Sequence, residues 1–401
     1  MKICGIIAEY NPFHNGHLYL INKIRQMGYS HIVAVMSGNF VQRGEPSVMS
    51  KWARTECALK SSVDLIVELP LTWAVSAAQN FALGGVSLLN SLGCAEALAF
   101  GCEIDDVHEL NRAVQVKNSK IFKSAFSEEI GIGKSYASAC SAALNKSSES
   151  INPEIFRLPN CILAQEYISA LKRLNSKIEP IAIKRHISSH DEIHTFTPIN
   201  TDIVSAAYIR ELIKSDKDYK RYVPSSSAYI IDRELALKSA PADISRLERA
   251  ILAFLRKCAP DDFAYLPDVS EGLQNRIYTA AKVSNSYSEL IDKIKTKRYT
   301  HARLRRIVLS TFLKMDVSLF NAEPPYIRIL GFNSRGKEIL RLARKTASAP
   351  IVMKAADVGQ LSEECRRLFD SESRADDIYA LSMPEIGGSG SNLTHGVIQR
   401  Y

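Results

Sequence analysis

The sequence has few cysteines and no Cys-x-x-Cys pair. Its eight thiols are scattered over 401 residues, at Cys4, Cys57, Cys94, Cys102, Cys140, Cys161, Cys258 and Cys365. This spacing indicates neither a zinc site nor a redox motif. We therefore expect reduced, mostly buried thiols and no metal bound by cysteine.

Long hydrophobic runs are also missing. No uninterrupted apolar stretch is long enough to span a bilayer, and the chain does not open with a basic segment followed by an apolar one. We therefore expect a cytoplasmic protein. The composition, 46% hydrophobic and 23% charged, is ordinary for a globular protein with a sizeable core. The net charge of +8 permits a polyanionic partner.

Short β-rich runs alternate with helical patterns in the first half of the chain. Strands are expected at residues 3–8, 31–38, 64–70, 97–101 and 178–185, and helices at residues 16–27, 51–61, 76–91 and 162–174. This alternation predicts an α/β fold with a parallel, doubly wound, Rossmann-like sheet. The polar residues 104–159 are expected to be inserted helical material, with a helix near residues 107–126.

Strand signals fade after about residue 214. A turn and helix cap at residues 223–227 are followed by helical patterns at residues 245–256, 273–281, 287–294 and 302–314. We therefore predict an α/β domain over residues 1–214 and a mainly α-helical domain over residues 215–401. Residues 327–332 and 350–353 are expected to be short strands of a later subdomain, and residues 387–392 a flexible tail.

The most informative motif is His14-Asn15-Gly16-His17, directly after the first apolar run. Two imidazoles three residues apart share one face of a helical turn, and a helix N-terminus attracts phosphate. We predict that His14 and His17 are catalytic and stabilise charge during in-line displacement at the α-phosphate of ATP. Gly16 would let the backbone approach phosphate, and Asn15 would add an amide contact. The alternative is two exposed histidines without a role.

Polar residues also follow other expected strands, where ligands bind in parallel sheets. Arg43 is a candidate for phosphate or an RNA backbone, and Gln42 for orienting a substrate; the alternative is a solvated loop. Gly101 would lie beside adenine or ribose, unless it is an ordinary strand-end turn. Asn160 is either a helix N-cap or a nucleotide ligand. Arg185 suits a polyphosphate, unless it belongs to a basic surface stub.

Residues 293–306 form the densest basic segment. They contain seven Lys or Arg residues, His301 and Tyr299, and no acid. Such clusters attract nucleic-acid backbones, and Tyr299 would stack on a base. The alternative is a solvated helix face. The predicted RNA contacts, with the loop residue included, are Arg43, Lys295, Lys297, Arg298, Tyr299, Arg303 and Arg306.

Several segments together resemble a known family. Residues 7–17, 36–46 and 64–70 are similar to those of the bacterial tRNA(Met) cytidine acetate ligases, which belong to the HxGH nucleotidyltransferase superfamily. Residues 100–103, 158–160 and 297–300 fit the same family, and the likeness spans roughly residues 1–310.

The resemblance implies a reaction and its partners. Acetate attacks the α-phosphate of ATP, which arrives as its Mg²⁺ complex, to give acetyl-adenylate and pyrophosphate. The N4 amine of wobble cytidine 34 of elongator tRNA(Met) then takes the acetyl group, without acetyl-CoA. No protein partner is implied. By likeness, the ATP site comprises Ile7, Ala8, Glu9, Tyr10, Asn11, Pro12, Phe13, His14, Asn15, Gly16, His17, Leu18, Tyr19, Leu20, Gly101, Asn160 and Arg185.

Residues 205–210 resemble the second signature of the superfamily, a hydroxyl-rich helix start near the triphosphate. Ala206 and Ala207 stand where hydroxyl residues often occur, so the expected phosphate contacts are limited to Ser205, Arg210 and backbone N–H groups. Asp64 and Glu68 are conceivable metal ligands, but acids within strands are more often structural. We therefore assign no metal ligands.

Two other functions fit part of the sequence. A small-molecule adenylyl- or cytidylyltransferase would use the same histidine loop, but it leaves the basic helical half unexplained. A non-catalytic RNA-binding protein on the same fold would retain the basic segment, but it leaves the intact histidine pair without a purpose.

Overall fold

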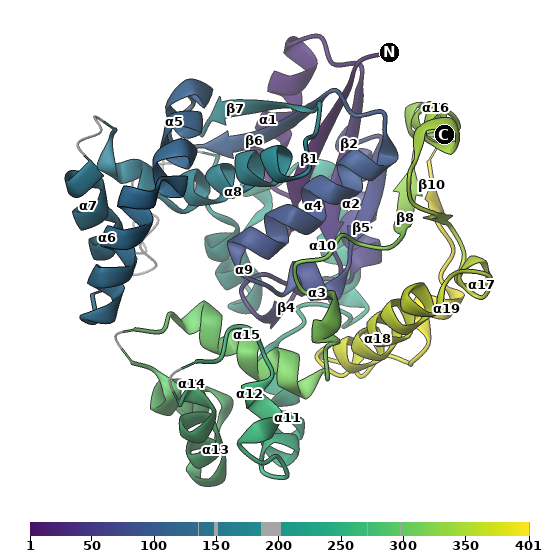
Figure 1. Ribbon diagram of the computed structural model, residues 1–401. Helices are drawn as coiled ribbons and strands as arrows, with labels where there is room; N and C mark the ends of the chain where they lie inside the picture. The colour runs from purple at the N-terminus through teal and green to yellow at the C-terminus, as the bar shows by residue number, and fades with distance from the viewer. Residues whose placement is uncertain (135, 148–150, 186–201, 271, 297, 401) are drawn as a thin grey trace.

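A mixed sheet of eight strands runs through the centre of the computed structural model (Figure 1). The structure describes residues 1–401 except 135, 148–150, 186–201, 271, 297 and 401, and the strand count refers to the described part. Five parallel strands are ordered β5-β2-β1-β6-β7. They are β1 (Ile3–Ala8), β2 (His31–Ser37), β5 (Leu65–Leu69), β6 (Ala97–Cys102) and β7 (Glu179–Lys184). The predicted doubly wound sheet is confirmed, and its strand order reverses between β1 and β6, where such folds bind ligands.

Helices cover both faces of this sheet. Alternate residues of each strand point to opposite faces, so continuous apolar strands present apolar side chains on both faces. Val33 and Val35 of β2 belong to one buried cluster, and Ile32 and Ala34 to the other. The first face is covered by α4 (Ala78–Leu92), α8 (Pro159–Arg173) and α16 (Ser334–Thr346), and the second by α1 (Asn15–Gln26), α2 (Lys51–Lys60), α9 (Ala206–Lys214) and α10 (Ser225–Ala236).

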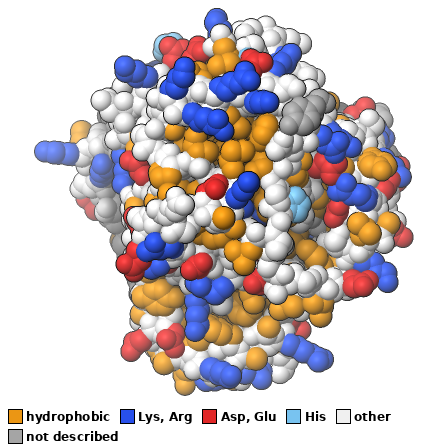
Figure 2. Space-filling model, turned by 90° about the vertical axis from the view of Figure 1, so that its right-hand side faces the viewer, with side chains coloured by type: hydrophobic (Ala, Val, Ile, Leu, Met, Phe, Trp, Pro, Cys, Tyr) orange, Lys and Arg blue, Asp and Glu red, His pale blue; other side chains and the backbone are white. Residues whose placement is uncertain are grey.

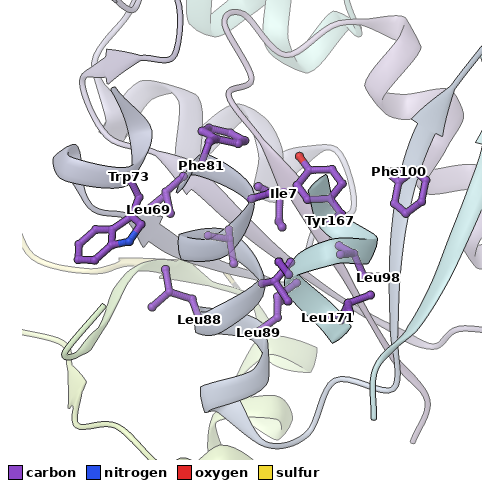
Figure 3. Packing of buried hydrophobic residues seen from close by; sticks show 14 of the residues in the cluster. Ile7, Leu69, Trp73, Phe81, Leu88, Leu89, Leu98, Phe100, Tyr167 and Leu171 are labelled. Atoms are coloured by element: carbon purple, nitrogen blue, oxygen red, sulfur yellow. The ribbon is translucent and has the colours of Figure 1, made fainter. Parts of the chain in front are cut away.

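Figure 3 shows the packing on the first face, where Ile7 of β1 and Leu98 of β6 meet Leu89 of α4 and Leu171 of α8. Each such side chain contributes roughly 1.5–3 kcal/mol by leaving water. Apolar residues recur in these helices with the spacing of a helical turn. This spacing is visible in the sequence, so the positions of the helices could be predicted.

The C-terminal segment departs from the prediction, because its strands join the main sheet instead of forming a later subdomain. β8 (Ile327–Phe332) pairs antiparallel with β5, and β9 (Ile351–Val352) and β10 (Ile398–Gln399) pair with β8. All six residues of β8 are buried, so the strand covers an edge of β5 that would otherwise be open. The last part of the chain therefore lies with the α/β sheet and not with the helices that precede it.

The predicted flexible tail is wrong for a related reason. Residue Asn392 is 1% exposed and lies in the short helix α19 (Ser391–Thr394). Its Oδ1 accepts a hydrogen bond from the buried ammonium group of Lys51 at 2.9 Å. A long-range partner orders this Gly- and Ser-rich segment, and local composition does not reveal such a partner.

The inserted segment between β6 and α8 is helical, as predicted, but it is divided. It contains α5 (Val107–Asn118), α6 (Lys120–Gly131), α7 (Tyr136–Ser147) and a 3-10 turn at Pro153–Phe156. The single helix expected near residues 107–126 breaks at Ser119, which has an extended backbone and caps α6 by accepting from the Phe122 N–H.

A separate group of helices lies at one end of the molecule, below the sheet in Figure 1. It is built from α11 (Glu248–Leu255), α12 (Asp261–Ala264), α13 (Leu273–Val283), α14 (Tyr287–Ile294) and α15 (His301–Phe312), which share their own core. We call these helices the helical unit. Four of them, α11, α13, α14 and α15, match the helices predicted there within a few residues, whereas α12 was not predicted. The described α-helices omitted so far are α3 (Leu71–Ala74), α17 (Ala355–Val358) and α18 (Glu363–Ala380).

No helix in the described ranges combines the length and the apolar character that a membrane crossing requires. On the face that carries the C-terminal elements, Lys and Arg side chains are interspersed with acidic and hydrophobic ones (Figure 2).

Candidate active site

An open pocket lies where the strand order reverses. The carboxyl ends of β1, β6 and β7 form its floor. Of the predicted ATP-site residues, ten line it: Ile7, Ala8, His14, Gly16, His17, Tyr19, Leu20, Gly101, Asn160 and Arg185. Seven other predicted residues are not among those that line it: Glu9, Tyr10, Asn11, Pro12, Phe13, Asn15 and Leu18.

The two histidines are fixed by a reciprocal cap at the start of α1. The Nδ1 atom of His14 accepts from the Gly16 N–H at 3.0 Å, and the Nδ1 atom of His17 accepts from the His14 N–H at 3.2 Å. This is a capping box in which imidazoles replace the usual hydroxyl and carboxylate. The rings stack with their centroids 3.8 Å apart. The motif therefore both starts the helix and orients its own side chains.

The cap also determines where each imidazole carries its proton. Because both Nδ1 atoms accept hydrogen bonds, the neutral rings are protonated at Nε2. Burial and the positive charges of Arg185 and Arg210 lower the pKa of His14 to about 3. Burial, His14 and Arg185 hold the pKa of His17 well below its ordinary value. The pair is thus neutral, with two Nε2–H donors.

Glycine is needed at position 16 because a side chain there would collide with the His14 ring. A Cβ atom at this position would stand 2.8 Å from Cε1 and 3.0 Å from Nδ1 of His14. Aromatic neighbours support the other ring: Tyr10 makes an edge contact with His17 at 4.9 Å, and Phe13 lies 5.4 Å from it. Both aromatic residues are buried. They hold the histidines from behind and do not line the pocket.

Three polar residues of the histidine loop form hydrogen bonds with the protein. Asn15 was expected to contact the ligand, but its amide donates to the carbonyl oxygens of Asp202 and Arg221, each at 2.9 Å. Asn11 Oδ1 accepts from the Val48 N–H at 2.8 Å. Glu9 Oε1 accepts from the Gln42 N–H at 2.9 Å. Each of these bonds ties the histidine loop to a segment distant in sequence.

Arg54 is a supporting residue that the sequence did not reveal. It is fully buried in α2, and its guanidinium donates to the carbonyl oxygens of Glu9 at 2.6 Å and Ser37 at 3.0 Å. These oxygens lie at the ends of β1 and β2. A buried arginine that satisfies backbone carbonyls fixes both loops, and its only sequence signal is a charge within an otherwise buried helix.

Asn160 and Arg185 meet on the opposite wall. Arg185 Nη1 donates to Asn160 Oδ1 at 3.1 Å, and Asn160 Nδ2 donates to Glu103 Oε1 at 2.7 Å. Asn160 lies inside the first turn of α8, whose N-cap is Leu158, so its interpretation as the N-cap is wrong. The proline that precedes it occupies the first helical position, which suits its fixed backbone angle. Gly101 leaves room for Arg185, because a Cβ atom there would stand 3.1 Å from Arg185 Cγ.

Ser205 and Arg210, the other two predicted phosphate contacts, lie at the start of α9 and within it, and neither is among the residues that line the pocket. Ser205 is the N-cap, and its hydroxyl accepts from the Tyr208 N–H at 3.2 Å. Arg210 donates to the carbonyl oxygen of Asn11 at 2.8 Å. Burial, and next the positive charge of Arg43, lower the pKa of Arg210. Arginines thus surround the neutral histidines, an arrangement that attracts a polyphosphate.

The pocket has apolar walls that were not predicted. Phe100 and Tyr167 lie with their ring centroids 5.7 Å apart and extend from the core of Figure 3 to the pocket. Ile203 and Val204 lie on the other side. Such residues suit the faces of a nucleobase, but in the sequence they cannot be told from ordinary core residues.

The basic segment is only partly available to an RNA. Lys297 lies outside the described residues. Arg298 is exposed, but Tyr299 is 8% exposed and belongs to the core of the helical unit, so base stacking by Tyr299 does not fit its burial. Arg303 donates to the carbonyl oxygen of Asp268 at 2.6 Å, and Arg306 forms an ion pair with the Asp268 carboxylate at 3.5 Å. These two arginines hold the helical unit together.

The acids considered as metal ligands are structural. Asp64 forms an ion pair with Arg25 at 2.6 Å and accepts from the Ile32 N–H at 2.7 Å. Glu68 forms a buried ion pair with Lys51 at 2.7 Å. Neither acid is among the residues that line the pocket.

The model of the HIGH Nucleotidyl Transferase family matches residues 1–391. The tRNA(Met) cytidine acetate ligase of Caldanaerobacter subterraneus subsp. tengcongensis is 39% identical over 408 residues, covering 100% of both chains. That of Acetivibrio thermocellus is 37% identical, over 99% of this chain and 100% of its own.

Solved structures of a related protein have the same fold as this chain. The crystal structure of Thermotoga maritima TmcAL bound with alpha-thio ATP is 31% identical, covers 100% of this chain and 99% of its own, and has a TM-score of 0.90. The apo form of the same protein gives a TM-score of 0.92. The chain therefore belongs to the HIGH Nucleotidyl Transferase family and, within it, to the tRNA(Met) cytidine acetate ligases.

Proposed function

We propose that this protein is an ATP-dependent ligase that acetylates N4 of wobble cytidine 34 in elongator tRNA(Met), in the cytoplasm. The observation that carries the proposal is the pair of oriented, neutral histidines in a pocket bordered by arginines. This chain also matches, over its full length, relatives named tRNA(Met) cytidine acetate ligase, which supports tRNA(Met) as the substrate.

In the first step, an acetate oxygen attacks the α-phosphorus of ATP and the bond to the bridging oxygen breaks. The products are acetyl-adenylate and pyrophosphate. The Nε2–H groups of His14 and His17 would donate to oxygens that gain charge as the bond breaks. Arg185 and Arg210 would supply positive charge. Removing one such donor typically costs roughly 3 kcal/mol in the transition state.

In the second step, the N4 amine of the cytidine attacks the carbonyl carbon of acetyl-adenylate. The amine loses a proton, and AMP leaves with the electrons of the broken bond. The two steps use one pocket, so the cytidine must reach the end of β1 where the adenylate is held. We assign no residue to removal of the amine proton.

Mg²⁺ is expected to reach the site bound to the phosphates of ATP. The described residues that line the pocket include no carboxylate, and the side chains of Asp64 and Glu68 are paired elsewhere. The residues present therefore do not fit a magnesium site built by the protein, and no step is derived through the ion.

We propose that tRNA binds to the exposed basic residues between the helical unit and the pocket. Arg43 of the β3–β4 hairpin (Phe40–Val41 and Glu45–Pro46) and Arg298 are both exposed. Lys295 and Lys297 belong to the same basic segment. An RNA held on this surface would lie between the helical unit and the loop that carries the histidines.

The first test is acetate-dependent exchange of pyrophosphate into ATP. His14→Asn and His17→Asn should each lower the exchange rate by at least about 100-fold. The matched control His108→Asn, at an exposed histidine, should leave it unchanged. Exchange that is equally fast without acetate, or unaffected by both variants, would overturn the proposal.

The second test separates RNA binding from ATP binding. Lys297→Ala with Arg298→Ala should weaken tRNA binding and reduce its salt dependence, since fewer counterions are released. Lys257→Ala, an exposed lysine of the helical unit outside the basic segment, is the control. An equal loss of ATP affinity in the double variant would contradict the assigned surface.

A further inference from the structure

A cluster of two thiols and a carboxylate lies beside the pocket wall. Cys102 ends β6, Glu103 follows it, and Cys161 lies in the first turn of α8. The two sulfur atoms are 3.3 Å apart, and Cys161 Sγ is 3.4 Å from Glu103 Oε2. Both cysteines are 0% exposed. The three ligand atoms lie within 4.8 Å of one another.

The carboxylate of this cluster is already oriented. Glu103 Oε1 accepts from Asn160 Nδ2 at 2.7 Å, which turns Oε2 toward the sulfurs. The Cys161 N–H donates to Oε2 at 3.1 Å. Hydrogen bonds of this kind hold metal-ligating carboxylates in place.

We propose that Cys102, Cys161 and Glu103 bind one thiophilic divalent cation such as Zn²⁺. Thiolate and carboxylate oxygen are both zinc ligands, and a tetrahedral ion places two ligating sulfurs about 3.8 Å apart. The sulfurs therefore need to separate by only a few tenths of an ångström. The ion replaces the two thiol protons, which pass to solvent. Its fourth position is filled by water.

The cluster is connected to the nucleotide pocket without being part of it. Cys102 follows Gly101 and Cys161 follows Asn160, and both of these neighbours line the pocket. Asn160 joins Glu103 to Arg185. An ion here would therefore fix the wall that carries Arg185. Binding of the ion requires neither ATP nor tRNA, so it can be tested separately from the proposed function.

The test is titration of the reduced, chelator-treated full chain with Co²⁺, followed by its sulfur-to-cobalt absorption. We expect one equivalent to bind, with up to two protons released, and Zn²⁺ to displace it. Cys102→Ser and Cys161→Ser should each weaken binding at least tenfold, and Glu103→Gln should weaken it less. Circular dichroism would show that each variant is folded.

Cys258→Ser, in the helical unit, is the control and should bind as the parent does. The proposal is overturned if no sulfur-to-cobalt absorption develops, or if the double variant Cys102→Ser with Cys161→Ser binds Co²⁺ as the parent does. It is also overturned if the untreated protein carries a Cys102–Cys161 disulfide in place of the ion, which intact mass would reveal.

Discussion

Gly44 lies directly against the backbone of Arg306. A Cβ atom on Gly44 would stand 2.6 Å from the Arg306 nitrogen. Two hydrogen bonds continue from this contact: Arg306 Nη1 donates to the Gln42 carbonyl oxygen at 3.3 Å, and the Gln42 N–H donates to Glu9 Oε1 at 2.9 Å. Through one hairpin, the helical unit is therefore connected to the loop that carries the histidines.

This contact predicts the effect of Gly44→Ala. Gly44 has a φ of +73°, and its new methyl group would meet backbone that cannot move aside. We expect a loss of about 1–3 kcal/mol in the free energy of unfolding, measured by urea denaturation. Gly388→Ala is the control, because no atom lies within 4 Å of its added Cβ. Equal stability of the two variants would show that the hairpin contact is loose.

The lowered histidine pKa values predict a dependence of stability on pH. Between pH 3 and the ordinary pKa of 6.5, the unfolded chain binds protons that folded His14 does not. The free energy of unfolding should therefore fall as the pH drops through this window, by up to about 1.4 kcal/mol per pH unit. Above pH 6.5, His14 contributes no slope.

His14→Asn tests this prediction, because asparagine retains a side-chain cap but does not titrate. Its unfolding free energy should fall less steeply than that of the parent between pH 6.5 and pH 5. Histidine NMR of the parent gives a direct check. A His14 resonance that titrates near 6.5 would contradict the prediction, as would identical slopes.

Gly16→Ala and Gly101→Ala should differ in activity. A methyl group on Gly16 would stand 2.8 Å from the His14 ring, which its cap and its stacked neighbour hold in place. A methyl group on Gly101 would meet Arg185 Cγ at 3.1 Å, and that flexible side chain can shift. We expect acetate-dependent exchange to fall at least tenfold for Gly16→Ala and less than threefold for Gly101→Ala, at similar melting temperatures. The reverse order would show that Arg185 is the more critical group.

The buried ion cluster around Lys51 predicts a large loss of stability. Lys51 Nζ lies 2.7 Å from Glu68 and 2.8 Å from Asp376, and all three side chains are buried. Lys51→Met would leave both carboxylates without their cation, which typically costs 3–5 kcal/mol. Urea denaturation should show this loss.

Lys60→Met is the matched control at the other end of α2. Lys60 is partly exposed and pairs with Glu56 at 3.6 Å, so we expect a loss below about 1 kcal/mol. Because Asp376 belongs to α18, a small effect of Lys51→Met would mean that the C-terminal segment is not held to the sheet by this ion cluster.

The sequence determined much of the catalytic half. Apolar runs predicted five parallel strands, because strands buried on both faces need continuous apolar residues. The His14-Asn15-Gly16-His17 motif predicted the site, because its chemistry and its place between a strand and a helix are both local properties. Gly101, Asn160 and Arg185 were predicted from their places at strand ends and at a helix start and from the family resemblance, and all three line the pocket.

Tertiary structure alone decided how distant residues are used. β8 joins the sheet edge and Asn392 meets Lys51 because buried polar and edge groups need partners, and no local pattern shows which partners they take. Asn15 and Tyr299 have the residue types of ligand contacts, but packing directs their side chains to backbone carbonyls and to a core. The sequence fixes which chemical groups are present, whereas long-range packing decides which of them remain free to meet a ligand.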